Sequence, residues 1–426
     1  MKIVRAAAIL LAVVLCAGKS FGYSVLTHEE IVDLLWASNI KPLIQQRFPG
    51  LTDDQITEAH AYAYGGSVIQ DLGYYPFGSK EFSDLVHYVR TGDFVAEMVK
   101  QSQDAKEFAF ALGAMAHYVA DVDGHPAINE AVSLRYPKLR ARYGKYVTYQ
   151  QDKVAHLKTE FGFDVSQVAK HRYAPEDYHN FIGFEVSEAL LERVFPVVYG
   201  LDLKDVLPHE ELAVGSYRWA ISQLIPHMTQ VALHIHGKQM VSETPNFEKR
   251  KFLYRLRRTE YERSWGKKYE KPGLGTRFLA ALLRIMPKIG PFRGLYFNEP
   301  TKQTEDLYIA SINKSFEDCR AVLEKTKTVP PKLQDRDLDT GALTKPAEYP
   351  LADDAYAHLL TQLADKKFAQ TSPELRANLI RFYANAAAPV KTKKNEEKWK
   401  KVLAALDQLK AAEPVEATAG KSPSAE

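Results

Sequence analysis

Cysteine is almost absent from this 426-residue sequence, which holds two cysteines in all. One of them, Cys16, lies in an apolar stretch at the start of the chain, so Cys319 is alone in the remainder. A single cysteine excludes an intramolecular disulfide there, and any cross-bracing must come from packing or from a metal held by other ligands. The sequence also lacks runs of alternating polar and apolar residues, which argues against a β-rich fold. Its formal net charge of +3 indicates no particular class of partner.

The first 22 residues have the pattern of a secretory signal peptide. A basic start precedes the apolar run AAAILLAVVLCAG, and Ser20 and Gly22 are the small residues of a cleavage site. This run is too short to span a membrane stably, and no later stretch is long and apolar enough to do so. We therefore expect an exported protein, periplasmic or secreted, whose new N-terminus is Tyr23. Because a terminal amine has a pKa of about 8, a nearby cation deprotonates it easily, and it can then bind the metal together with its own carbonyl oxygen.

Helical signals dominate the sequence. Thr27 and Glu30 have the spacing of a capping box at a helix start, and Thr52 and Gln55 repeat that spacing. The second of these helices is expected to end at the Gly-Gly pair that follows it. Apolar residues recur at helical intervals in most other segments. We predict an all-α fold, a multi-helix bundle whose site is built from side chains on facing helices, followed by an additional helical C-terminal region.

Residues of the kind that bind metals recur at intervals of four in the most apolar helix, within HYVADVDGH. Residues four apart share a helix face, so His117 and Asp121 can point at one ion. His156 and Glu160 repeat the spacing in HLKTE. One such pair is more often a solvated surface contact, and a lone histidine on an apolar face is more often a hydrogen-bonded core residue. Two pairs on separate helices favour a metal centre, and histidine with carboxylate ligands suits zinc.

Four further residues extend this set, namely His28, Asp71, His87 and His125. On a continuous helix, His125 would stay on the same face as Asp121. We expect the helix to break at DGHP, because Gly124 is flexible and Pro126 disfavours helix in the residue before it. His125 would then turn towards a second ion.

In order and type, these residues resemble the ligands of the zinc-dependent phospholipase C and S1/P1 nuclease family. The resemblance covers about residues 23–160, with helical continuation to about 240, and implies an all-α enzyme with a trinuclear zinc site. The implied ligands are Tyr23, His28, Asp71, His87, His117, Asp121, His125, His156 and Glu160. By resemblance, the first zinc ion would be held by Asp71, His87, His117 and Asp121, the second by Tyr23, His28 and a shared Asp121, and the third by His125, His156 and Glu160. Tyr23 stands where the family usually has Trp, and the step from Asp121 to His125 is shorter than is usual in the family.

The chemistry that this resemblance implies is hydrolysis of a phosphodiester. Zinc lowers the pKa of a bound water to about 7, so that hydroxide is available to attack phosphorus near neutral pH. Asp71 would orient or deprotonate the attacking water, as the family suggests.

Other polar residues receive structural interpretations: Asp123 as a solvated loop residue, His60 as a helix-surface residue, and His234 and His236 as packing or capping residues.

Positive charge is concentrated between residues 249 and 293, which hold 14 Lys or Arg against three Glu. Aromatic residues alternate with these charges in KRKFLYRLRRTEYERSWGKKYEK. One interpretation is a solvated basic helix followed by a core helix. The other is a docking surface, either for an anionic phospholipid interface or for nucleic acid, and the sequence does not separate these two ligands.

These features divide the chain into a signal peptide (1–22), a catalytic domain (23–240), a basic, aromatic-rich helical segment (241–300), a helical C-terminal region (301–412) and a disordered tail (413–426). VPPKLQDRDLDTGALTKPAEYP, in the C-terminal region, is typical of a Pro- and Asp-rich connector. The leading hypothesis is an exported zinc-dependent phosphodiesterase of the phospholipase C type, acting on phospholipids and in peripheral contact with an anionic membrane surface. A zinc nuclease acting on single-stranded nucleic acid is the first alternative. A zinc-stabilised envelope or binding protein without turnover is the second.

Overall fold

The computed structural model describes residues 25–75, 77–169, 184–219, 299–327, 331–389 and 393–412. Most of these residues are helical, and the part of the chain described contains no strand beyond one isolated bridge between Arg336 and Leu343. The prediction of an all-α fold with a helical C-terminal region is therefore confirmed. Several predictions fall outside the described residues: the signal peptide, Tyr23, His234, His236, the basic segment and the C-terminal tail.

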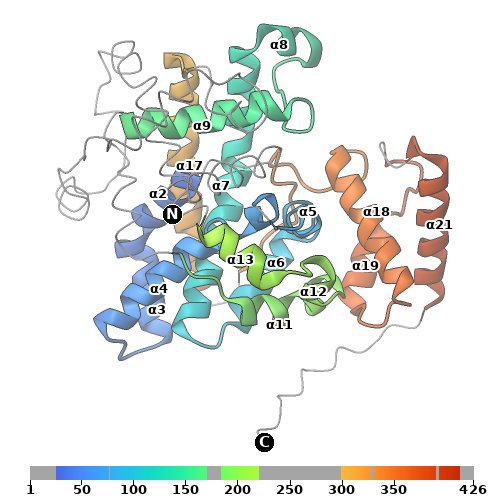
Figure 1. The fold of residues 1–426 in the computed structure, drawn as a ribbon, viewed down its shortest axis with the longest axis horizontal. Helices are drawn as coiled ribbons and strands as arrows, with labels where there is room; N and C mark the ends of the chain where they lie inside the picture. The colour runs from blue at the N-terminus through green and yellow to red at the C-terminus, as the bar shows by residue number, and fades with distance from the viewer. Residues whose placement is uncertain are drawn as a thin grey trace, which may run out of the picture.

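From α2 to α9, the helices follow one another with short connections and frequent changes of direction (Figure 1). Their bounds are α2 Val25–Leu35, the π-helix η1 Trp36–Ile40, α3 Lys41–Arg47, α4 Asp53–Gly66, the 3-10 helix η2 Ile69–Tyr74, α5 Lys80–Tyr88, α6 Thr91–Gln101, α7 Ala105–Arg135, α8 Pro137–Tyr143, α9 Lys153–Ala169, α11 Glu188–Tyr199, α12 Leu203–Val206, α13 Glu210–Trp219, α17 Lys302–Thr326, α18 Pro350–Asp365, α19 Pro373–Phe382 and α21 Glu396–Ala411.

The long helix α7 is central to the fold. It has 31 residues and packs most extensively against α4 and α17, while α2, α6 and α9 also contact it. Since α17 comes from the C-terminal region, the core around α7 combines helices from the N-terminal and C-terminal parts of the chain. Nearly all of α7 up to Ala120 is buried. A polar residue on this helix therefore lies in the interior and needs a partner there.

Glycine lets α4 and α7 approach closely. A Cβ on Gly113 of α7 would lie 2.1 Å from the Ala63 carbonyl oxygen of α4, and one on Gly66 of α4 would clash equally with α7. The chain then enters η2 directly beside α7, where the Gln70 side-chain amide donates a 2.9 Å hydrogen bond to the Ala114 carbonyl. The close packing of these two helices thereby brings η2 to the buried face of α7.

The capping box predicted at Thr27 is wrong, whereas the one at Thr52 and Gln55 is confirmed. Helix α2 has already begun before Thr27, so this side chain lies within the helix. Its hydroxyl donates a 2.7 Å hydrogen bond to Asp164 of α9 and lies 2.6 Å from the Tyr308 hydroxyl of α17. Thr27 therefore fixes α2 to two other helices instead of capping its own.

The C-terminal helices α18, α19 and α21 lie together on one side of the molecule, where α18 packs against α5 and α21 (Figure 1).

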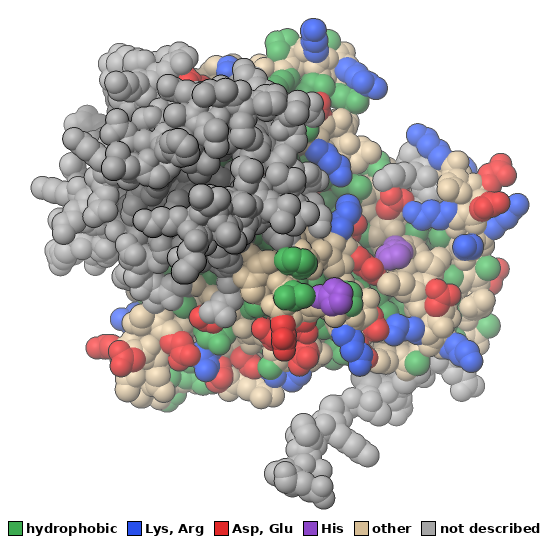
Figure 2. Space-filling view, in the orientation of Figure 1, with side chains coloured by type: hydrophobic (Ala, Val, Ile, Leu, Met, Phe, Trp, Pro, Cys, Tyr) green, Lys and Arg blue, Asp and Glu red, His purple; other side chains and the backbone are tan. Residues whose placement is uncertain are grey.

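Asp and Glu side chains gather in the lower part of the face shown in Figure 2, where Figure 1 has α11 and α13. There, burial and then Glu192, Glu188 and Glu211 raise the pKa of Glu210 to about 7. Among the described residues, no helix is both long and apolar enough to cross a membrane.

Candidate metal centre

Three buried groups of histidine and carboxylate side chains lie around α7. They are His28, His117 and Asp121; Asp71, His87 and His117; and His125, His156 and Glu160. Within each group, the candidate ligand atoms lie within 4.8 Å of one another. Eight of the nine residues predicted from the sequence are thus brought together, and the ninth, Tyr23, is outside the described residues. Because His117 belongs to two groups, these two form one continuous cluster.

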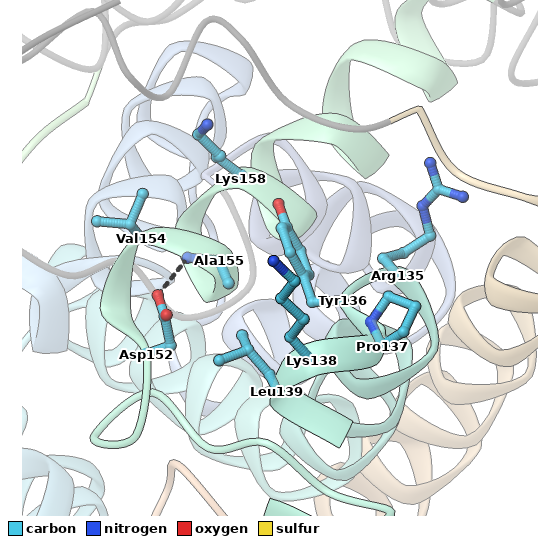
Figure 3. Close-up of a pocket in the computed structure, with 9 residues that line it drawn as sticks. All are labelled: Arg135, Tyr136, Pro137, Lys138, Leu139, Asp152, Val154, Ala155 and Lys158. Carbon is cyan, nitrogen blue, oxygen red and sulfur yellow. Dashed lines mark hydrogen bonds between the residues drawn. The ribbon is translucent and has the colours of Figure 1, made fainter. Parts of the chain in front are cut away.

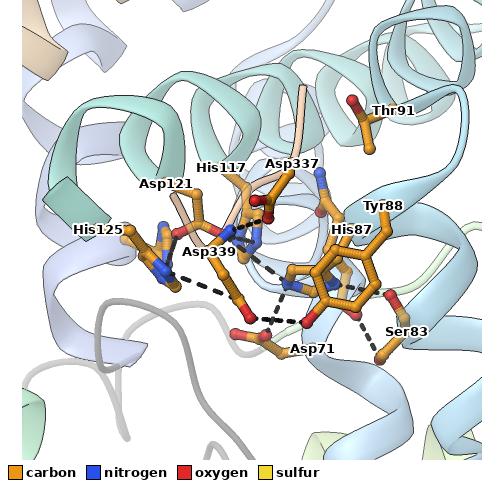
Figure 4. Close-up of polar contacts among 12 residues, drawn as sticks. Asp71, Ser83, His87, Tyr88, Thr91, His117, Asp121, His125, Asp337 and Asp339 are labelled. Carbon is orange, nitrogen blue, oxygen red and sulfur yellow. Dashed lines mark hydrogen bonds and ion pairs between the residues drawn. The ribbon is translucent and has the colours of Figure 1, made fainter. Parts of the chain in front are cut away.

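Asp121 lies in the middle of this cluster (Figure 4). Its Oδ1 is 3.4 Å from Nε2 of His28 and 3.6 Å from Nε2 of His125, and its Oδ2 is 2.9 Å from Nε2 of His117 and 3.7 Å from Nε2 of His87. Burial acts to raise the pKa of Asp121, but His117 and His125 hold it well below its usual range. An ionised carboxylate with both oxygens facing imidazoles is placed to be shared between ions, and it links the third group to the first two.

Helix α5 and η2 place Asp71 beside His87. The Ser83 hydroxyl of α5 donates a 2.5 Å hydrogen bond to the Gln70 carbonyl of η2 and accepts one of 2.9 Å from the Gly73 amide. With the two elements fixed in this way, Nε2 of His87 lies 3.4 Å from Oδ1 of Asp71. Burial lowers the pKa of His87, but the Asp71 carboxylate and others nearby raise it to about 9. The site therefore concentrates negative charge around this imidazole.

Backbone carbonyls set the ring orientation of two of the histidines. Nδ1 of His87 lies 2.8 Å from the Ser83 carbonyl oxygen, and Nδ1 of His117 lies 2.8 Å from the Ser67 carbonyl oxygen. A carbonyl oxygen only accepts, so in both rings Nδ1 carries the proton. When the ring is neutral, as it would be with a bound cation, Nε2 is left with its lone pair directed into the cluster, which is the usual arrangement of a metal-binding histidine.

The helix break predicted at DGHP is wrong. Helix α7 runs without interruption from Ala105 to Arg135, with Pro126 inside it. His125 therefore stays on the face of Asp121, as expected for residues four apart. Helix α9 supplies the remaining ligands to that face: the ring centroids of His125 and His156 are 5.4 Å apart. A second helix, and not a turn in the first, completes the third group.

Pro126 lies inside α7, next to a close contact from the C-terminal region. Pro126 has no N–H, so the Val122 carbonyl loses the donor that would normally come from the next helical turn. Gly341 lies against this carbonyl with a φ of +72°, and a Cβ on it would be 2.3 Å from the oxygen. Only glycine combines that backbone conformation with such a close approach.

The donor atoms of these groups fit a zinc centre. A set of buried atoms makes no hydrogen bond among the described residues: both carboxylate oxygens of Asp71, Asp121 and Glu160, and both ring nitrogens of His125 and His156. Buried polar atoms without partners are costly, so atoms that converge in this way are suited to a cation. Histidine nitrogens and carboxylate oxygens without cysteine are a donor set that zinc accepts.

The pair formed by His156 and Glu160 illustrates this need for a cation. Nε2 of His156 lies 2.6 Å from Oε1 of Glu160. Burial, followed by repulsion from His125, lowers the pKa of His156 well below its usual value. Burial, followed by repulsion from Asp121, raises the pKa of Glu160 well above its usual value. A zinc ion between the two would bind the neutral imidazole and stabilise the charged carboxylate.

The sequence interpretation missed the carboxylates that surround the cluster. Asp339 of the predicted connector is buried, and its Oδ1 lies 3.7 Å from Nδ1 of His125. Asp164 of α9 accepts hydrogen bonds from the Leu26 amide and the Thr27 hydroxyl at the start of α2. The only local signal was the alternation of aspartates in DRDLD within a loop, and this pattern contains no information about which helix the loop contacts.

Two residues interpreted as solvent-exposed are in fact buried. Asp123 lies in α7 and pairs with Lys314 of α17, while burial raises the pKa of this carboxyl to about 6. His60 stacks on Trp36, with ring centroids 3.7 Å apart, and on Tyr64, with centroids 4.5 Å apart. Both side chains serve packing between helices and lie outside the three groups.

A pocket of about 710 Å³ lies where α7, α8 and α9 meet (Figure 3). Its lining combines apolar with basic side chains: Arg135, Tyr136, Pro137, Lys138, Leu139, Asp152, Val154, Ala155 and Lys158. None of the residues of the three groups lines it. The pocket is therefore separate from the cluster, which among the described residues holds the groups suited to a metal ion.

Comparison with known proteins agrees with this donor set. Residues 27–206 match the family described as zinc dependent phospholipase C. The matched segment contains all eight candidate ligands that the structure describes, and the resemblance stated from the sequence is confirmed. No curated protein and no solved structure matches the chain. Zinc is the metal of the matched family, and the three buried groups are able to bind it.

Proposed function

We propose that the chain, whose residues 27–206 match the zinc-dependent phospholipase C family, is an exported phosphodiesterase that hydrolyses phospholipids. One observation carries this proposal: the three buried groups form a single cluster centred on the Asp121 carboxylate. A structural zinc site has a closed set of ligands, usually four. Here eight ligand-type residues converge within one interior, which is the arrangement that multi-metal phosphodiester hydrolysis requires.

The proposed reaction forms a bond from a water oxygen to phosphorus and breaks the bond from phosphorus to the glycerol oxygen. Zinc ions, when bound, supply Lewis acidity towards phosphoryl oxygens and make a water more acidic near neutral pH. The products are diacylglycerol and the phosphorylated headgroup. The proton lost by water must pass to a base, and the departing glycerol oxygen must gain a proton.

Asp71 is the residue that we assign to the first proton transfer. Its carboxylate is fully buried, and neither oxygen makes a hydrogen bond among the described residues. The neighbouring His87, 3.4 Å away, keeps one carboxylate oxygen oriented towards the cluster. A carboxylate held in this way can orient the attacking water and accept its proton.

Export is part of the proposal, because it would give the centre its last ligand. The predicted cleavage leaves Tyr23 at the N-terminus, two residues before the start of α2. His28 lies one turn into that helix and belongs to the first group. A free amine and carbonyl oxygen at Tyr23 could then bind the ion held by His28 and Asp121.

Contact with an anionic membrane surface is also proposed. Its support is the sequence between residues 249 and 293, where basic and aromatic side chains alternate. This segment lies outside the described residues.

The substrate class is tested by two assays on the zinc-loaded, full-length mature chain. Release of diacylglycerol from phosphatidylcholine vesicles is measured beside cleavage of single-stranded DNA, each with and without a zinc chelator. We expect chelator-sensitive lipid hydrolysis and little DNA cleavage. Cleavage of DNA without lipid hydrolysis would instead favour a zinc nuclease, and turnover of neither substrate would favour a zinc-stabilised binding protein.

A further inference from the structure

The connector between α17 and α18 borders the metal cluster. We call its residues 331–349 the aspartate loop; they lie outside the segment that matches the family. The Leu338 amide donates a 3.1 Å hydrogen bond to the carbonyl of His87, one of the candidate ligands. The Asn129 side chain of α7 donates a 2.9 Å hydrogen bond to the Asp339 carbonyl. The aspartate loop is thus bonded to α5 and α7, which together carry four of the eight described candidate ligands.

Within this loop, the Asp339 carboxylate is held rigidly. Its Oδ2 accepts hydrogen bonds from the hydroxyls of Tyr88, at 2.8 Å, and Tyr349, at 2.7 Å. Its backbone amide donates to Oδ1 of Asp337 at 2.9 Å. These three contacts leave the other side-chain oxygen, Oδ1, directed towards Nδ1 of His125 at 3.7 Å (Figure 4).

His125 differs from the other two histidines of α5 and α7 in the cluster. His87 and His117 both have Nδ1 within 2.8 Å of a backbone carbonyl oxygen. Nδ1 of His125 makes no hydrogen bond among the described residues, and the acceptor that faces it is Asp339. A metal-binding histidine usually donates its second ring N–H to a carboxylate or carbonyl, which fixes both tautomer and orientation.

We propose that Asp339 is the positioning residue of His125. Its Oδ1 accepts the Nδ1 proton of His125, and this contact aims the Nε2 lone pair at the ion of the group formed with His156 and Glu160. A small rotation of the His125 ring closes the 3.7 Å gap to a hydrogen bond. The three ligands of this zinc site all lie inside the family-matched segment. The aspartate loop, which lies outside that segment, thereby completes the site. This inference rests on the proposed function, in that it takes the cluster to hold zinc.

The test compares the same substitution at two positions of the aspartate loop. Asp339→Asn keeps the shape of the side chain and an oxygen that accepts from both tyrosines, but removes the charge that faces His125. Asp335→Asn is the matched control, because Asp335 is partly buried in the same loop and accepts instead from the Gly92 and Asp93 amides of α6. Zinc affinities of the full chain are measured by competition with a chelator, and thermal unfolding is followed with and without zinc.

We expect Asp339→Asn to lower the affinity for one zinc ion by about 10–100-fold. The affinities for the other zinc ions and the unfolding temperature of the metal-free protein should change little. Asp335→Asn should leave all zinc affinities unchanged. If the Asp339→Asn variant does not fold, Tyr349→Phe is used in its place. Tyr349→Phe should lower the affinity for the same zinc ion by a smaller factor, because Asp339 loses one of the two tyrosine hydroxyls that hold its carboxylate. Unchanged zinc affinities would overturn the inference, and so would a lower metal-free unfolding temperature with zinc binding intact.

These readouts separate the inference from the proposed function. Zinc competition needs no substrate, so a chain that binds its zinc ions but hydrolyses no phosphodiester would contradict the function and leave the role of Asp339 to be decided by affinity. Conversely, full lipid hydrolysis with unchanged zinc affinity in Asp339→Asn would overturn the role of Asp339 and leave the function standing.

Discussion

The Tyr88 hydroxyl donates a 2.8 Å hydrogen bond to Asp339, although 251 positions separate the two residues in the chain. Tyr88 directly follows the candidate ligand His87, and Asp339 faces the candidate ligand His125. The interior that holds the metal-type residues is therefore closed by a segment far beyond the family-matched region.

Loss of a central ligand should remove both metal and activity. His117→Ala and Asp121→Ala each delete a side chain that faces other ligands of the cluster at 2.9–3.7 Å. Because even outer partners of a metal site typically change affinity or activity by 10–100-fold, a direct ligand should cost more than about 100-fold in hydrolysis. Zinc content is measured beside turnover, with His358→Ala, an exposed histidine of α18, as control. Variants of His117 or Asp121 with full zinc and full turnover would remove these residues from the site.

The close packing of α4 and α7 predicts opposite effects of one substitution at two glycines. Gly113→Ala places a Cβ 2.1 Å from a backbone carbonyl oxygen, which cannot move aside cheaply, and should lower the free energy of unfolding by about 1–3 kcal/mol or more. Gly215→Ala, on the exposed side of α13 with nothing near its Cβ, should raise it by roughly 0.5–1 kcal/mol. Urea unfolding of both variants checks this, and equal effects would show that helix contact does not limit position 113.

The acidic patch of α11 and α13 predicts a pH dependence. The pKa of Glu210 is raised from 4.5 to about 7, so its contribution to folding is full below pH 4.5 and is lost as pH rises through 7. Glu210→Gln removes this titration. Between pH 4.5 and pH 7.5, the free energy of unfolding of the Glu210→Gln variant should therefore fall less than that of the wild type. Parallel pH curves for the two proteins would show that Glu210 titrates normally.

The basic segment predicts salt-sensitive binding to membranes. Replacing Arg255, Arg257 and Arg258 with Ser should weaken binding to anionic vesicles by roughly 3 kcal/mol, at about 1 kcal/mol for each basic residue near the surface. Raised salt should mimic the variant, because exposed charges are screened beyond about 10 Å at 0.1 M. Hydrolysis of a small soluble phosphodiester should barely change. Vesicle binding that ignores both salt and the substitutions would make the segment a solvated surface only.

The candidate ligands could be predicted because two ligands on one helix have a characteristic spacing in the sequence. Histidine and carboxylate four residues apart share a helix face, and this holds for His117 with Asp121 and for His156 with Glu160. The all-α class followed from helical periodicity for a similar reason, since the period of apolar residues reflects the face that packs. Both signals are contained within a single helix.

The features that could not be predicted all depend on contacts between distant elements. The sequence places Gly124 and Pro126 where a helix often ends, but α7 is continuous through both residues and packs against α4, α17 and the backbone at Gly341. Thr27 has the spacing of a cap, yet its hydroxyl reaches Asp164 of another helix. The role of Asp339 likewise depends on how the aspartate loop crosses α5 and α7.

The central claim is tested most directly by adding zinc back to the metal-free mature chain while measuring diacylglycerol release from phosphatidylcholine. The account predicts no release without zinc and a rise to full activity as the three groups fill, with a final content of three zinc ions per chain. A chain that takes up its full zinc content and still releases no diacylglycerol would contradict it.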